Sequence, residues 1–179
     1  MVQGVLSAEG IQNRGGGEAV IPRLHHSQDS ALKIVQREYK QKHHFKPVGF
    51  WYSVGDEWAK WCISEEFCDI AGYCIYAIGV DESRILKIAT PADLLLFTKA
   101  FEVPFPAREL YDYNIDWTRV AAMYGGIEIA PYHYSMRLDC QTSWYYPWDV
   151  ASGCVWDTSA ITLCTKTYEP DAVTPTPIP

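Results

Sequence analysis

A chain of 179 residues and 20.3 kDa is long enough for one domain of ordinary size and leaves little room for a second core. Hydrophobic residues make up 48% and charged residues 21%, which excludes a disordered tail protein, a collagen-like fibre and a coiled coil. The formal net charge of −7 argues against strong non-specific binding to nucleic acid, because such binding needs many Lys and Arg contacts with phosphates.

The two ends of the sequence differ from its middle. Residues 1–19 contain Gly15, Gly16 and Gly17 among small and polar residues, which predicts a flexible leader, and the proline-rich residues 169–179 predict a disordered tail. We therefore expect one globular domain over residues 20–168. No apolar run is long enough to span a bilayer, and no secretory signal is visible, so we expect a soluble, cytoplasmic protein without a membrane partner and leave a non-classical route of delivery open.

The first half of this domain shows two strand patterns, each followed by a helix pattern. Residues 21–26 suit a strand, and Asp29 or Ser30 can cap a helix over residues 31–39. A bulky extended run at residues 50–53 predicts the next strand. Asp56 then sits where a helix cap is expected, before a helix that carries tryptophans.

The second half alternates strands and helices. Residues 74–80 and 84–89 predict two strands that form a hairpin, and Thr90 with Pro91 opens a helix that reaches Phe101. The remaining predicted elements are a helix over 116–124 that ends at Gly125 and Gly126, and strands over 127–130, 152–157 and 161–167. This order predicts an α+β fold.

Six cysteines occur without a CxxC pair, at positions 62, 68, 74, 140, 154 and 164. Cys62, Cys68 and Cys74 with His43 or His44 could be imagined as a zinc site, but their spacing fits none of the usual patterns, so no metal is expected. We expect reduced, largely buried thiols, and a solvent-facing position for the two histidines.

Aromatic residues are unusually frequent, at 14% of the chain, with seven Trp and twelve Tyr. They serve either a Trp-rich core or a wall that stacks on a flat ligand. Residues 49–62 combine a glycine that allows close backbone approach, the aromatic run Phe50-Trp51-Tyr52, the hydroxyl of Ser53 and further tryptophans, which favours a stacking wall.

Four polar side chains are candidates for chemistry. His25 and His26 end the first predicted strand beside Ser27, at a corner of the kind that often carries a site. Asp149 lies among aromatic residues, and Glu128 lies between two isoleucines, where alternation could equally turn it to solvent. The usual nucleotide-fold, phosphate-loop, hydrolase and zincin motifs are absent from the sequence.

Three stretches resemble the ADP-ribosyltransferase superfamily, the NAD-consuming fold of bacterial toxins and poly-ADP-ribose polymerases. They are residues 23–27 (RLHHS), residues 49–62 (GFWYSVGDEWAKWC) and residues 152–161 (SGCVWDTSAI). The resemblance implies an ADP-ribosyltransferase-like split mixed β-sheet with flanking helices. It also implies NAD as substrate, nicotinamide as leaving group, and a protein, nucleic acid, small molecule or water as acceptor.

The resemblance also implies roles for individual residues. His26 would orient the ribose and carboxamide with Ser27 beside it, and Trp61, or Trp58 in its place, would stack on nicotinamide. Further NAD contacts would come from a set of residues on the same elements: His25, Gly49, Trp51, Tyr52, Ser53 and Ser152. Ser152 occupies the place expected for the catalytic glutamate, so Asp149 or Glu128 would have to supply the carboxylate.

Two alternatives remain. The aromatic cleft could belong to a non-catalytic binding module for a nucleotide, sugar or peptide, as the missing glutamate suggests. The acidic run from Asp56 to Asp69 could contact a basic partner, although such runs are commonly solvated faces.

Overall fold

A computed structural model describes residues 21–103 and 115–170 of the chain. The expected leader at 1–19 and most of the expected tail at 169–179 lie outside the described residues. The described part forms a single α+β body, as predicted, and none of its helices is long and apolar enough to cross a bilayer.

The main sheet has seven strands in the order β5-β7-β8-β3-β1-β4-β9, and β5 and β7 are its parallel pair. Its strands are β1 (Arg23–Ser27), β3 (Phe50–Val54), β4 (Cys74–Val80), β5 (Ile85–Ile88), β7 (Gly126–Ile129), β8 (Ser152–Val155) and β9 (Ile161–Tyr168). A small second sheet pairs β2 (His43–His44) with β6 (Ile115–Asp116), and both histidines are exposed, as expected.

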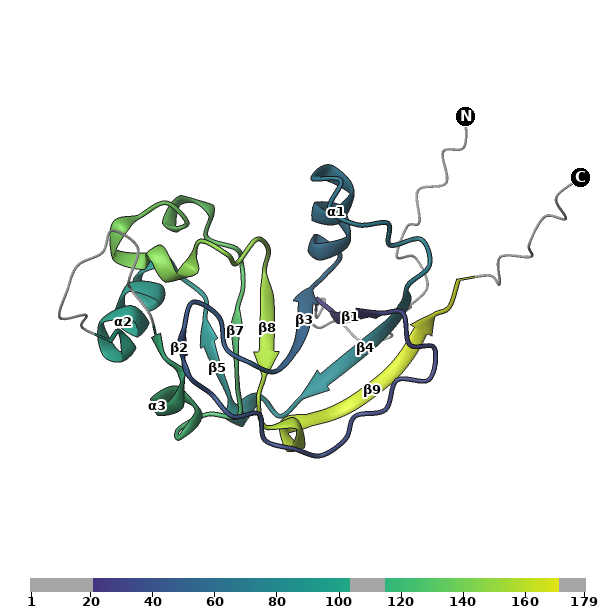
Figure 1. Ribbon diagram of the computed structural model, residues 1–179, viewed down its shortest axis with the longest axis horizontal. Coiled ribbons are helices and arrows are strands. Elements are labelled where there is room, and N and C mark those ends of the chain that lie inside the picture. The colour runs from purple at the N-terminus through teal and green to yellow at the C-terminus, as the bar shows by residue number, and fades with distance from the viewer. Residues whose placement is uncertain (1–20, 104–114, 171–179) are drawn as a thin grey trace, which may run out of the picture.

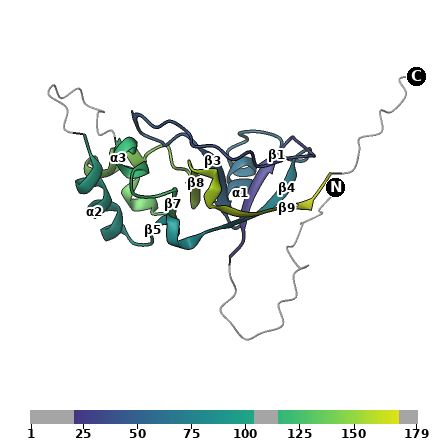
Figure 2. The same ribbon diagram turned by 90° about the horizontal axis from the view of Figure 1, so that it is seen from below.

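Three α-helices accompany the sheet in the described residues: α1 (Glu57–Ser64), α2 (Pro91–Phe101) and α3 (Trp117–Ala121). Short 3₁₀ helices cover Glu82–Arg84, Tyr134–Met136, Cys140–Tyr145 and Thr158–Ala160. Figure 1 shows α2 and α3 beside β5 and β7, whereas α1 stands above β3. Seen from below in Figure 2, α2 and α3 lie at one end of the molecule and β4 and β9 at the other.

Most predicted elements are present, but the helix expected over residues 31–39 is wrong. This segment is extended, and its backbone bonds to distant residues: the Tyr39 amide donates to the Trp156 carbonyl and the Arg37 amide to the Thr158 hydroxyl. Leu32 and Ile34 are half-buried between exposed neighbours, which is the alternation of an extended chain. Tertiary contacts therefore override a short, marginal helix pattern.

The hairpin expected between residues 74–80 and 84–89 is also wrong. β4 has β1 on one edge and β9 on the other, so neither edge can accept β5. Asp81 accepts a hydrogen bond from the Ser83 amide and starts a 3₁₀ turn, after which β5 pairs in parallel with β7. The turn therefore carries the chain to the far side of the sheet.

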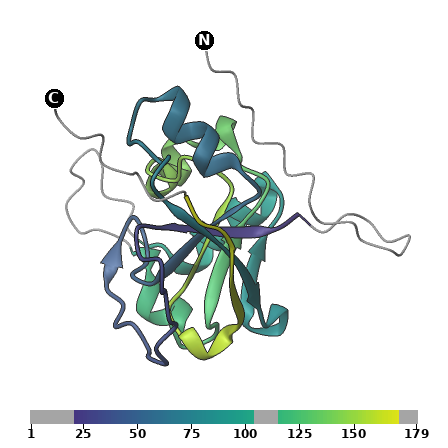
Figure 3. The same ribbon diagram turned by 90° about the vertical axis from the view of Figure 1, so that its right-hand side faces the viewer.

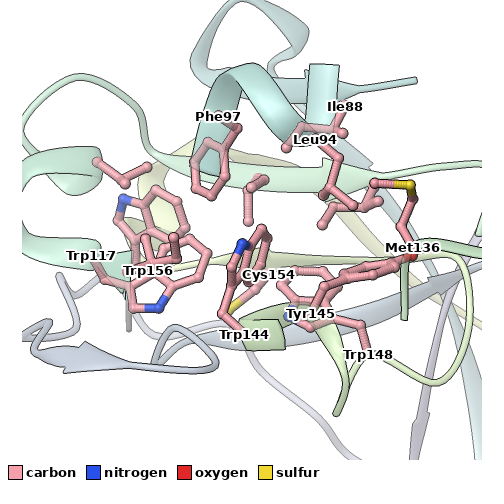
Figure 4. Close-up of a cluster of buried hydrophobic side chains, with 14 residues drawn as sticks. Ile88, Leu94, Phe97, Trp117, Met136, Trp144, Tyr145, Trp148, Cys154 and Trp156 are labelled. Atoms are coloured by element: carbon pink, nitrogen blue, oxygen red, sulfur yellow. The ribbon is translucent and has the colours of Figure 1, made fainter. Parts of the chain in front are cut away.

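A large aromatic core lies between α2, α3 and the β5-β7-β8 side of the sheet. Figure 4 shows Phe97 and Leu94 of α2 facing the indole rings below them. The fully buried tryptophans of this cluster are Trp117, Trp144, Trp148 and Trp156. The other three tryptophans are half-buried and line a pocket, so the seven tryptophans serve both the core and a cavity wall.

Candidate functional site

The main sheet divides between β1 and β3. The two strands pair only at Arg23 with Val54 and at Leu24 with Ser53, although each continues along its other neighbour. Beyond this point the imidazole of His25 bridges the strands, because its Nδ1 lies 2.7 Å from the Trp51 carbonyl oxygen. A carbonyl oxygen only accepts, so Nδ1 carries the hydrogen and Nε2 of the neutral ring is an acceptor.

A pocket of about 430 Å³ opens at this division, on the side of the sheet covered by α1. Figure 3 shows α1 above β1 and β3. The lining residues of β1, β3 and β8 form the floor of the pocket. The volume lies within the range of small-molecule sites. The lining residues come from β1, β3, α1, the turn after α1, β8 and the segments before β3 and β8: Leu24, His25, His26, Lys46, Trp51, Tyr52, Ser53, Trp58, Trp61, Phe67, Asp149, Val150 and Ser152.

The α1 side of the pocket is aromatic. Trp58 packs against His26 with ring centroids 4.9 Å apart, and Trp61 packs against Phe67 at the same distance. Both tryptophans lie on one face of α1, at the i, i+3 spacing that the sequence predicted. Two indole faces therefore oppose the strand floor.

One cation, Lys46, and one carboxylate, Asp149, line the pocket. Lys46 Nζ lies 5.2 Å from the centre of the Trp51 ring, which itself packs edge-on against Trp148 at 5.0 Å. Burial lowers the pKa of Lys46, and the charge of Asp149 acts against that change. Asp149 accepts a hydrogen bond from Arg137 at 3.2 Å, and about a quarter of its side chain is exposed.

His26 is neutral at physiological pH. Burial, and then the proximity of His25, lower its pKa from 6.5 to about 4. Burial also lowers the pKa of His25, against the effect of its bond to Trp51. The pocket thus presents two uncharged imidazoles beside its indole walls.

Glu128 lies on the opposite face of the sheet from the pocket floor. It pairs with Gly153, which pairs with Tyr52, whereas Ser53 and Ser152 are one position along and face the other way. Its carboxylate accepts from Tyr52 at 2.9 Å and pairs with Arg23 and Lys87 at 2.5 and 2.6 Å. Glu128 is therefore buried and absent from the pocket lining, although the sequence left open whether it faced solvent.

The two serines of the floor are cross-strand partners whose hydroxyls bond to backbone carbonyls. Ser53 lies 3.0 Å from the Gly55 carbonyl and 3.2 Å from that of Leu24, and Ser152 donates to Val150 at 3.0 Å. Each hydroxyl keeps a lone pair for a ligand donor.

Two predicted ligand contacts lie outside the pocket lining. At Gly49 a Cβ atom would come within 2.6 Å of Cys154 Sγ and of the Val155 carbonyl oxygen, so this glycine allows close packing of the chain before β3 on β8. Ser27 accepts a hydrogen bond from the Asp29 amide at the end of β1. Neither residue is brought to the cavity.

Lys46 and Phe67 line the pocket, but no pattern in the sequence singles them out. Lys46 precedes a proline in a segment that the sequence predicts as a loop. Phe67 packs against α1 after a turn that no local motif predicts.

Two residues of the acidic run make contacts within the protein. Glu57 accepts a hydrogen bond from the Ala151 amide at 2.9 Å, and Asp56 forms an ion pair with Lys60 at 2.9 Å.

In the described residues no three His, Cys, Asp or Glu side chains gather as metal ligands would. All six cysteines are free; Cys62, Cys74 and Cys154 are buried, as expected, while Cys140 is exposed. Comparisons with protein families, curated proteins and solved structures give no match for this chain. The pocket is therefore the feature from which a function can be inferred.

Proposed function

We propose that this pocket binds NAD and that the protein is an NAD-dependent mono-ADP-ribosyltransferase or NAD glycohydrolase. The observation that carries the proposal is the division of the sheet beside α1, which gathers His26, Trp51 and Trp61 around one cavity. This grouping is the one that the resemblance to the ADP-ribosyltransferase superfamily implies for nicotinamide. We infer that the sheet is of that superfamily's split type.

The pocket walls suit a flat, positively charged ring. Nicotinamide in NAD is cationic, and indole faces attract a cation by about 1 kcal/mol or more when water is excluded. Neutral imidazoles at His25 and His26 add no opposing positive charge. Lys46 is the one ammonium group among the lining residues and would contact the diphosphate.

The reaction breaks the bond between C1′ of the ribose and the nicotinamide nitrogen. The electron pair of that bond leaves with nicotinamide, which becomes neutral, and C1′ takes on oxocarbenium character. A carboxylate stabilises this developing charge. Asp149 is the carboxylate among the lining residues, whereas Glu128 is committed to Arg23 and Lys87 on the other face. The acceptor, or water, then adds to C1′ and gives up its proton.

A non-catalytic binding module is the second candidate. Ser152 stands where the resemblance places a catalytic glutamate, and Arg137 partly neutralises Asp149. Such a module would hold a nucleotide, sugar or peptide in the same pocket without turnover.

The test combines thermal melting with mass spectrometry of released nicotinamide. We expect NAD to raise the melting temperature and nicotinamide to be released. Asp149→Asn should lower the release rate by about 100-fold, since it removes charge stabilisation of the transition state. His26→Ala should weaken NAD binding by about tenfold, as the loss of one good hydrogen bond does.

Glu65→Gln is the matched control, because it also exchanges a carboxylate for an amide but on the exposed end of α1. It should match the unmodified protein in both assays. Stabilisation by NAD without nicotinamide release would favour the binding module. No stabilisation by millimolar NAD would contradict both the transferase and NAD as ligand.

A further inference from the structure

Two of the six thiols lie next to each other at the end of α1. Cys68 Sγ is 3.7 Å from Cys62 Sγ, and neither cysteine is in a disulfide. Cys62 is fully buried in the last turn of the helix, and Cys68 is half-buried beyond the following turn. Cys62 is therefore shielded from solvent, whereas Cys68 is partly accessible.

The turn between the two cysteines brings them together. The Phe67 amide donates to the Cys62 carbonyl at 3.0 Å, and Glu66 has a φ of 50°, which reverses the chain. A disulfide requires its sulfurs at about 2.05 Å, so the side chains of Cys62 and Cys68 must move closer together before the bond can form. The residues between the cysteines, 63–67, lie exposed at the surface.

We propose that Cys62 and Cys68 form a reversible redox pair that peroxide oxidises to a disulfide. Hydrogen peroxide first converts the more accessible Cys68 thiol to sulfenic acid and is itself reduced to water. The Cys62 sulfur then attacks the Cys68 sulfur, the S–O bond breaks, the Cys62 proton leaves with the oxygen, and a second water forms. Two thiols and one peroxide give one disulfide and two waters, and two molecules of a small thiol restore the two Cys thiols and are themselves oxidised to a disulfide.

The order of these steps follows from burial. Burial, and then the hydrogen bond with Cys68, raise the pKa of Cys62 to about 12. A thiol that remains protonated is a poor first target for peroxide. Cys62 is therefore the resolving cysteine, which acts once a sulfenic acid stands beside it.

The pair is built into the rim of the pocket. Each cysteine adjoins a lining aromatic residue, Trp61 or Phe67, and those two rings are 4.9 Å apart. A disulfide would fix Phe67 over Trp61 and stiffen the turn between them. Oxidation would thus change access to the pocket whatever its ligand, and the thiol chemistry does not depend on the proposed function.

Cleavage after Glu66 separates the two cysteines into different peptides, and fragment-ion spectra of the joined peptides distinguish Cys68 from Cys74, which lies in the same peptide. The native protein is treated with hydrogen peroxide, alkylated, and cut with a glutamyl endopeptidase. We expect the two peptides to be joined, with the loss of two hydrogen atoms, and to separate after reduction with dithiothreitol. The amides of residues 63–67 should exchange hydrogen more slowly in the oxidised protein.

Single variants keep the proposal falsifiable. Cys62→Ser should leave Cys68 as a sulfenic acid that dimedone traps, whereas Cys68→Ser should leave Cys62 as a thiol. Cys140→Ser, at the exposed cysteine outside the pair, should still form the linked peptides. Peroxide treatment that modifies Cys68 without linking it to Cys62, or that links Cys68 mainly to another cysteine, would overturn the proposal.

Discussion

His25 and His26 are neighbours on β1, and the alternation of the strand gives their rings different surroundings. His25 packs on Phe50 at 4.3 Å and bonds to the Trp51 carbonyl, which ties the two diverging strands together. His26 faces α1 and packs against Trp58. Both histidines therefore line the pocket, and His25 also joins the two strands where the sheet divides.

His26 should titrate far below an ordinary histidine. We expect its imidazole resonances, followed by NMR, to change with a midpoint near pH 4. Its folded pKa is lower than its unfolded value of 6.5, so its contribution to stability is complete above pH 6.5 and is lost as the pH falls toward 4. Trp58→Ala removes the ring that covers it and should move the midpoint upward. A midpoint near 6.5 in the unmodified protein would contradict the buried position.

At the scale of elements, the sequence predicts correctly those helices and strands whose determining contacts lie within a few residues along the chain. The start of α2 is set by its own residues: Thr90 accepts from the Asp93 amide, and Asp93 accepts from the Thr90 amide. Residues 31–39 failed because their partners, among them Thr158, are more than a hundred residues away. Likewise β5 lies beside β7, which no local pattern could indicate.

The cap of α2 provides the test at this scale. Thr90→Ala leaves the Asp93 amide without its side-chain acceptor and should destabilise the protein by about 1 kcal/mol, measured by urea denaturation. Thr90→Ser keeps a hydroxyl in the same place and should cost much less. Equal losses in both variants would show that the methyl group of Thr90, rather than the cap, is what matters.

The candidate site was predictable in part for the same reason. The aromatic helix face and the histidines of β1 can be identified from the sequence, and the structure brings His26, Trp51 and Trp61 together. The choice between two acids could not be made, because the face on which Glu128 lies is fixed by its register with Gly153 on another strand. Side-chain alternation alone is the same for either face.

On the scale of the whole molecule, one buried carboxylate connects much of the sheet. Glu128 of β7 bonds to Tyr52 of β3, Arg23 of β1 and Lys87 of β5. Burial alone would raise the pKa of Glu128, but hydrogen bonds from Arg23 and Lys87 outweigh it and the pKa is lowered. The carboxylate thus stays charged and joins both parts of the sheet beneath the division that forms the pocket.

Exchange of this carboxylate for an amide should weaken the entire fold. Removal of one partner of a buried ion pair costs about 3–5 kcal/mol, and we expect Glu128→Gln to cost about 3 kcal/mol because Glu82 remains beside both cations. Glu82 contacts the same Arg23 and Lys87, but more than half of its side chain is exposed, so Glu82→Gln should cost less than about 1 kcal/mol.

The stabilisation by Glu128 should also depend on pH. Since the folded pKa of Glu128 is depressed, the stability that it contributes relative to glutamine should be complete well above pH 4.5 and should shrink as the pH falls through the folded pKa. Urea denaturation of both variants at neutral and acidic pH measures this, and equal losses for the two variants would mean that burial does not decide the strength of the network.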